Sequence, residues 1–150
     1  MDREQRERVL DRLDIGEQLD EVVVDIVKVL TTPSSKDKPV PGVAVRRLDD
    51  FTLEVTAHRV ILRSAYSHIL GEKKGQLLGK LGFHPVRDGS ASEVLAFAIY
   101  FNEHGSGNIA GVPGQIDLGL AGLEDYESME LRRAFKLHAA GAVGAILERF

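Results

Sequence analysis

Apolar residues recur at helical spacing near both ends of the chain. Between Gly16 and Leu30 they fall at every third or fourth position, with acidic residues on the other side, which predicts an amphipathic helix. Asp14 stands just before this segment, where its side chain can accept a bond from a free backbone N–H and cap the helix. A second apolar stripe begins near Asp125 and continues to the end of the sequence. We therefore expect long N- and C-terminal amphipathic helices.

Alternating apolar and polar residues predict short strands in the middle of the sequence. The clearest alternation is at residues 51–55, and residues 43–45 form a shorter segment of the same kind. Asp49 and Asp50 stand between the two segments, and because aspartate favours turns we expect a hairpin here. A further short strand is predicted at residues 115–120.

Two apolar segments fit either a helix or a strand. Residues 57–70 are long for a strand and are followed by Gly71, a residue type that commonly ends helices. Residues 94–101 are apolar throughout, and the spacing of Ser90 and Glu93 ahead of them is that of a helix cap. We expect a helix in both segments, with an additional strand as the alternative in each case.

These elements indicate an α+β fold: a helix-rich single domain with a small antiparallel sheet. At 150 residues the chain is long enough to bury a core without crosslinks. Residues 1–30 are expected to form an N-terminal helical arm, because residues 2–13 contain few apolar side chains. Proline and serine residues in 31–42 predict a linker. Residues 43–150 are expected to form the main body, and all three parts belong to one structural domain.

Composition excludes several classes of site. The chain has no cysteine, which rules out disulfides and cysteine-based chemistry. Its histidines form no i, i+4 pair, and we expect neither a metal nor a cofactor. The longest apolar run, residues 94–101, is shorter than the roughly 20 residues that cross a bilayer, so no membrane partner is expected. The charged N-terminus lacks the apolar core of a signal peptide, which predicts a cytoplasmic or virion protein that is not secreted by such a signal.

Charge is distributed unevenly along the chain. The formal net charge is −4, yet residues 56–88 contain more bases than acids, and both ends of the chain contain more acids than bases. Segments of opposite sign suit head-to-tail or face-to-face self-association. The same bases could instead contact nucleic-acid phosphates, with Arg59 and Arg63 on one face of the expected helix, although no set of aromatic residues for base stacking accompanies them. These candidate contacts are Arg59, Arg63, Lys73, Lys74 and Lys80.

The stretch at residues 102–114 is unusually rich in glycine. Such a loop can bind a ligand, because glycine lets the backbone approach closely, or it can form a shaped contact with another subunit. Glu103 and His104 at its start are the one pair we would test as catalytic residues, since a histidine near a carboxylate can act as a general base. The candidate loop residues are Gly105, Ser106, Gly107, Asn108, Gly111 and Gly114.

We interpret the sequence as that of a structural or assembly protein that acts in a homo-oligomer or with other protein subunits, including the case of a virus particle. The opposite charges of its segments and the arm that is poor in core residues favour this interpretation. One alternative is a small ligand-binding domain or hydrolase-like enzyme centred on Glu103 and His104. Another is a nucleic-acid-associated protein that uses the bases within residues 59–80.

Overall fold

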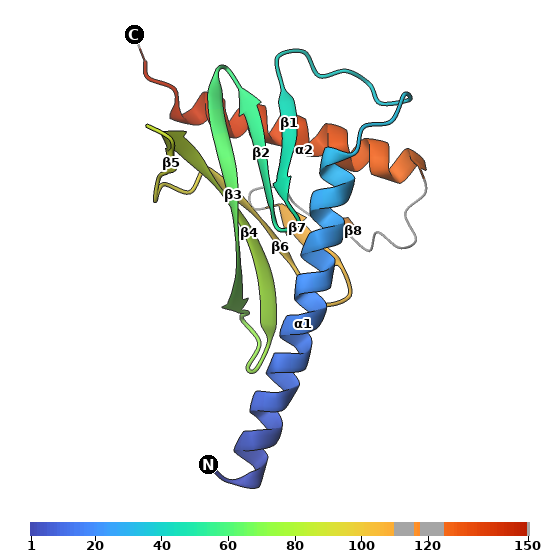
Figure 1. The fold of residues 1–150 in the computed structure, drawn as a ribbon, viewed down its shortest axis with the longest axis vertical. Helices are drawn as coiled ribbons and strands as arrows, with labels where there is room; N and C mark the ends of the chain where they lie inside the picture. The colour runs from blue at the N-terminus through green and yellow to red at the C-terminus, as the bar shows by residue number, and fades with distance from the viewer. Residues whose placement is uncertain (110–115, 118–124, 150) are drawn as a thin grey trace.

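The computed structural model describes residues 1–109, 116–117 and 125–149. Helix α1 (Arg3–Thr31) begins the chain and helix α2 (Asp125–Ile146) ends the described part, with an antiparallel sheet between them in sequence (Figure 1). The strands are β1 (Ala44–Asp49), β2 (Thr52–Ala57), β3 (Val60–Leu70), β4 (Leu77–Arg87), β5 (Ser90–Ala91), β6 (Phe97–Phe101), β7 (Ser106–Ile109) and β8 (Ile116–Asp117).

The sheet has the strand order β1-β2-β3-β4-β6-β7-β8, and β5 pairs separately with β4. Every described pair of strands is antiparallel. The α+β class and the terminal helices are confirmed, as is the hairpin between β1 and β2. The small size expected for the sheet is wrong, because both segments that we expected to be helical contribute strands.

The helix expected over residues 57–70 is strand β3. His58 and Arg59 both have positive φ angles, 49° and 63°, which is the backbone conformation of a two-residue hairpin turn. This turn usually contains glycine or asparagine, so the sequence gives no signal for it. Arg59 and Arg63 therefore do not share a helix face, since Arg59 lies in the turn and Arg63 in the strand.

The helix expected over residues 94–101 is also wrong, since strand β6 pairs there with β4 and β7. The segment is apolar throughout because both faces of the strand are covered. Phe97 and Ile99 belong to the main core, and Ala98 on the opposite face is 0% exposed. Ser90 does not cap a helix but begins β5.

The helical arm expected over residues 1–30 is a single helix, α1, and its N-terminal cap lies ahead of the one expected at Asp14. Asp2 caps it: its side chain accepts a bond from the backbone N–H of Gln5, and the Gln5 side chain accepts one from the backbone N–H of Asp2. Asp14 lies inside the helix and accepts a bond from Gln18, so its expected role as a cap is wrong. One unbroken helix therefore joins the charged N-terminal segment to the apolar segment at residues 16–30.

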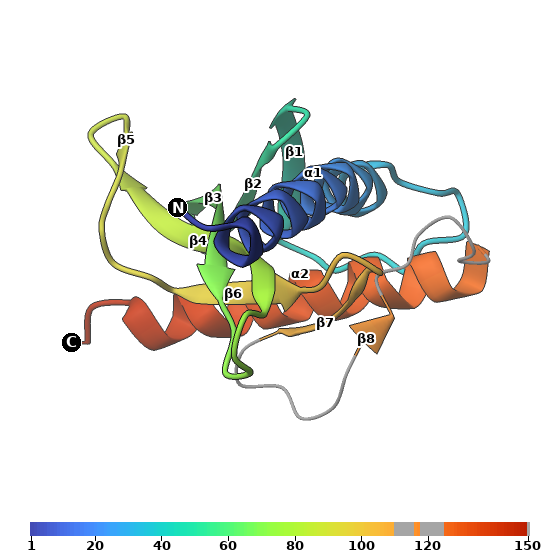
Figure 2. The same cartoon turned by 90° about the horizontal axis from the view of Figure 1, so that it is seen from below.

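Both helices pack on the same face of the sheet. Seen from below, the sheet curves around α1, from β1 on one side to β8 on the other, while α2 crosses behind (Figure 2). The centre of the core contains an aromatic group in which the rings of Phe83 and Phe97 stack with centroids 4.5 Å apart and Phe135 of α2 packs against both. The buried residues that α1 contributes are Gly16, Leu19, Val23, Ile26, Val27 and Leu30.

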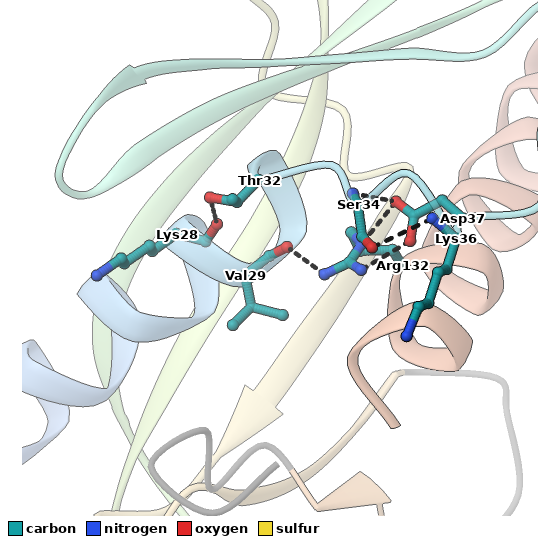
Figure 3. Close-up of polar contacts among 7 residues, drawn as sticks. All are labelled: Lys28, Val29, Thr32, Ser34, Lys36, Asp37 and Arg132. Carbon is teal, nitrogen blue, oxygen red and sulfur yellow. Dashed lines mark hydrogen bonds and ion pairs between the residues drawn. The ribbon is translucent and has the colours of Figure 1, made fainter. Parts of the chain in front are cut away.

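An ion pair ties the segment after α1 to α2 (Figure 3). The Arg132 side chain, 8% exposed, donates to both carboxylate oxygens of Asp37 at 2.9 and 2.7 Å. It also reaches the carbonyl oxygen of Val29 in the last turn of α1, at 3.5 Å. The guanidinium holds the pKa of the Asp37 carboxyl below its usual value. The proline- and serine-containing segment is therefore fixed to both helices at this point.

Removing the Arg132 charge is expected to destabilise the fold. The Arg132→Met variant keeps most of the side-chain volume but leaves the Asp37 carboxylate without its bidentate donor, which should lower the free energy of unfolding by about 2 kcal/mol. Urea denaturation at neutral pH measures this. Arg133→Met, at an exposed position of the same helix, is the matched control and should change stability little. Equal stabilities of the two variants would contradict the role given to this ion pair.

Candidate functional site

The first half of the glycine-rich stretch forms a β-hairpin between β6 and β7. The Asn102 side chain accepts bonds from the backbone N–H groups of His104 and Ser106, at 2.9 and 3.1 Å. Gly105 has a φ of 80°, the left-handed conformation that glycine adopts without strain. Asn108 pairs with Tyr100 across the two strands. The other two loop candidates, Gly111 and Gly114, lie outside the described residues.

Gly107 is required by the close approach of β7 to β6. A Cβ atom at this position would collide with the backbone carbonyl oxygen of Tyr100. Gly105 and Gly107 therefore each have a structural use within the hairpin, and their role in binding a ligand or another subunit stays a prediction.

The structure brings Glu103 and His104 close together at the turn of this hairpin. The His104 Nε2 atom lies 3.5 Å from a carboxylate oxygen of Glu103. However, the His104 side chain is 78% exposed, and in water an adjacent charge contributes little electrostatic stabilisation. The catalytic role of this pair therefore stays a prediction. The exposed position of the His104 side chain gives it no support.

The candidate phosphate contacts do not form one patch. Arg59 lies in the turn before β3, whereas Lys73 and Lys74 lie in the turn after it. The 11 residues of β3 separate these turns, a distance of roughly 35 Å for an extended strand. Arg63 and Lys80 lie between the two turns, within β3 and β4.

A buried carboxylate neutralises part of this positive charge. Glu54 of β2 is 5% exposed on the sheet face opposite α1 and α2, between the side chains of Arg46 and Arg63. Its two oxygens accept bonds from these guanidinium groups, at 2.6 and 2.9 Å. Burial opposes ionisation, but the two arginines outweigh it and hold the pKa of Glu54 below its usual value. Glu54 therefore stays ionised and fixes Arg63 on the sheet.

A polar cluster that the sequence analysis missed connects α1 to β3. Tyr66 donates from its hydroxyl group to Asp20 at 2.7 Å, and the His68 Nε2 atom lies 2.8 Å from that hydroxyl and 2.9 Å from Asp20. Burial and the Asp20 carboxylate raise the pKa of Tyr66 well above its usual value, so the phenol stays a donor. Gly16 packs against the His68 ring, where an added Cβ would lie 3.0 Å from Cε1. The cluster holds α1 where its buried part begins.

An apolar groove lies between β6 and α2, with a volume of about 600 Å³. His138 lines it and packs edge-on against Phe97, with ring centroids 5.1 Å apart. Burial lowers the pKa of His138, because desolvation disfavours the charged imidazolium. The other lining residues are Leu95, Ala96, Ala98, Leu137, Gly141 and Ala142.

The N-terminal half of α1, residues 1–14, projects beyond the sheet and is exposed throughout (Figure 1). Among its side chains Val9, Leu10 and Leu13 are 43%, 64% and 63% exposed, which leaves an uncovered apolar surface. Ion pairs one turn apart, Arg3–Glu7 and Glu4–Arg8, support the helix in water. The interval that we assigned to an arm, residues 1–30, thus has an exposed half and a buried half. We call the exposed residues 1–14 the projecting helix.

No family model, curated protein or solved structure matches this chain. In the part of the chain that the structure describes, no helix is long and apolar enough to span a membrane. The same residues include no group of three or more histidine, aspartate or glutamate side chains placed to bind a metal ion.

Alanine is expected to have opposite effects on stability at two glycines, one in the hairpin of β6 and β7 and one in α2. Gly107→Ala places a methyl group against a backbone carbonyl and should lower the free energy of unfolding by about 1–3 kcal/mol. Gly141→Ala, in the interior of α2 where an added Cβ meets no atom, should raise it by up to about 1 kcal/mol. Urea denaturation measures both. If Gly107→Ala is as stable as the unaltered chain, the strand pairing described here is wrong.

His138 is expected to make stability depend on pH in the acidic range. Because its pKa is lowered in the folded state, the unfolded chain binds this proton more readily once the pH falls below the usual histidine pKa of about 6.5. Stability that is present above this pH should therefore be lost as the pH falls towards the lowered value. Denaturation of the unaltered chain and of His138→Gln between pH 7.5 and 5.5 should show a smaller loss in the variant. An equal loss of stability in both proteins would contradict the lowered pKa assigned to His138.

Proposed function

We propose that this chain is an assembly protein that associates with copies of itself through the projecting helix. The observation that carries the proposal is the exposure of Val9, Leu10 and Leu13 on a helix whose other half is buried in the core. An exposed apolar surface on an otherwise polar segment is a common mark of a protein–protein contact. No reactive group accompanies it, and the proposed role is therefore binding.

The continuity of α1 supports this role. A free helix of about 14 residues is marginal in water, because nucleating it costs more than its few hydrogen bonds return. Here the buried half of α1 supplies the nucleus, and Asp2 with Gln5 closes the far end. The apolar side chains are then presented in one orientation, which lowers the ordering cost of binding a partner.

Two narrower expectations from the sequence remain predictions. A virus-particle component is one form of the proposed assembly protein, and the chain would then be recovered with purified particles. A nucleic-acid-associated role has little support, because Arg59 lies far from Lys73 and Lys74 and the bases do not form one patch. It would require binding that weakens steeply with added salt.

Polar substitution on the projecting helix should reduce self-association. The Leu10→Ser/Leu13→Ser variant removes most of the exposed apolar surface, and we expect its dissociation constant to rise at least about tenfold, equivalent to about 1.4 kcal/mol. Sedimentation equilibrium over a range of concentrations measures this. Leu147→Ser, which replaces a leucine that is 40% exposed beyond the end of α2, is the control and should behave as the unaltered chain. A chain that remains a monomer at all concentrations would overturn the proposal.

A further inference from the structure

The buried half of α1 carries a row of carboxylates on its outer side. Asp14, Glu17, Glu21 and Asp25 are all exposed and lie at helical spacing, roughly 180° around the helix from the stripe that packs on the sheet. No lysine or arginine occurs between Arg12 and Lys28, and none of the four carboxylates forms an ion pair with a residue that the structure describes. This acidic row is therefore uncompensated within the described part of the molecule.

The opposite side of the molecule is basic. Both described helices pack on one face of the sheet, and neither lies against the other face, which we call the outer face (Figure 2). From β1 to β6 its outward positions include Arg46, Arg63 and Lys80 and a single carboxylate, Glu54, which already binds the two arginines. Lys80 forms no ion pair with any described residue. A net positive charge remains on this face.

The outer face also has an apolar end. Ile69 of β3 pairs with Leu78 of β4 next to the turn that joins these strands, and both are half-buried. Moving away from this turn, the next pair on the outer face is Ser67 and Lys80, two residues along each strand. Arg63 of β3 lies another four residues along. In the row between these basic positions Ala65 is exposed, whereas Gly82 and Ala98 are buried, and the side chains of Leu95, His84 and Lys80 lie over Gly82.

The spacing of these features matches that of α1. On the helix, Glu17 follows Leu13 by about 6 Å and Asp25 follows it by about 18 Å, at 1.5 Å per residue. On the sheet, Lys80 lies about 7 Å from Leu78 along the strand, and the level of Arg63 lies about 20 Å from it. The apolar position and two charged positions, Glu17 and Asp25, therefore recur in the same order and at similar intervals on the sheet with opposite charge, whereas Glu21 falls near the level of the uncharged Gly82.

We propose that α1 of one copy lies along the outer face of β3 and β4 of a second copy. This inference rests on the proposed self-association and names the surface that receives the helix. Leu10 and Leu13 pack on the Ile69–Leu78 end, and Glu17 lies near Lys80. Asp25 lies at the level of Arg63, and the exposed Ala65 lies between the two basic positions.

This contact joins two different surfaces on opposite sides of the molecule. Each copy that offers its α1 to one neighbour still has its outer face free for another. Such head-to-tail contacts generate rings when the rotation between copies closes, and open filaments when it does not. The proposed assembly therefore grows beyond a dimer as the concentration rises.

Charge reversal on each surface tests the inference. Glu17→Lys/Glu21→Lys alters the helix, and Lys80→Glu alters the sheet while leaving the pairs of Glu54 with Arg46 and Arg63 in place. Each variant alone should have a dissociation constant at least about tenfold higher at low salt. Mixing the two variants should restore association, because the sheet variant still has an unaltered α1 and the helix variant still has an unaltered outer face. Glu130→Lys/Glu148→Lys, at exposed positions outside both surfaces, changes the net charge in the same direction and by the same amount as the helix variant and is its control.

Circular dichroism and urea denaturation establish that each variant folds, and sedimentation equilibrium measures association. Weaker association of each variant alone, with association recovered in the mixture, supports the inference. If Leu10→Ser/Leu13→Ser abolishes association but the charge reversals act as the control does, the projecting helix binds elsewhere, so this inference fails while the proposed function stands. If the unaltered chain never associates, both fail.

Discussion

The structure depends on the burial of one stripe of α1 in the curved inner face of the sheet. Leu19, Val23 and Ile26 are fully buried there, and the Asp20–Tyr66–His68 cluster marks where this contact begins. Because α1 is continuous, fixing its buried half also orients the projecting helix. The same packing places α1 and α2 on the inner face of the sheet, so a single contact determines which surfaces these two helices leave uncovered.

Local signals predicted the elements whose structure is decided locally. The two long helices follow from apolar spacing over many turns, and the hairpin of β1 and β2 follows from alternation around Asp49 and Asp50. Strands β3 and β6 were expected only as the alternative to helices, because their state depends on partners distant in sequence. An apolar run such as residues 94–101 fits a buried helix equally well until its neighbours on both sides are known.

The candidate site was predictable only in part. The scarcity of apolar residues near the N-terminus indicated a segment outside the core, and the uneven charge indicated surfaces of opposite sign. The contacts that fix these surfaces could not be derived, since Arg132 and Asp37 are 95 residues apart and Tyr66 and Asp20 are 46 apart. Nor did composition distinguish a glycine needed for strand pairing, such as Gly107, from one needed for a ligand.

Because the chain has no cysteine, a single introduced cysteine reports on contacts between copies. Gln18→Cys places a thiol beside the acidic row of α1, and Ser67→Cys places one on the outer face next to Lys80. Both substitutions leave the charged residues in place. When the two chains are mixed under mild oxidation, helix-to-sheet binding predicts a disulfide between them, formed faster than between Gln18→Cys and a Glu148→Cys control. Equal rates for the two mixtures would contradict the account.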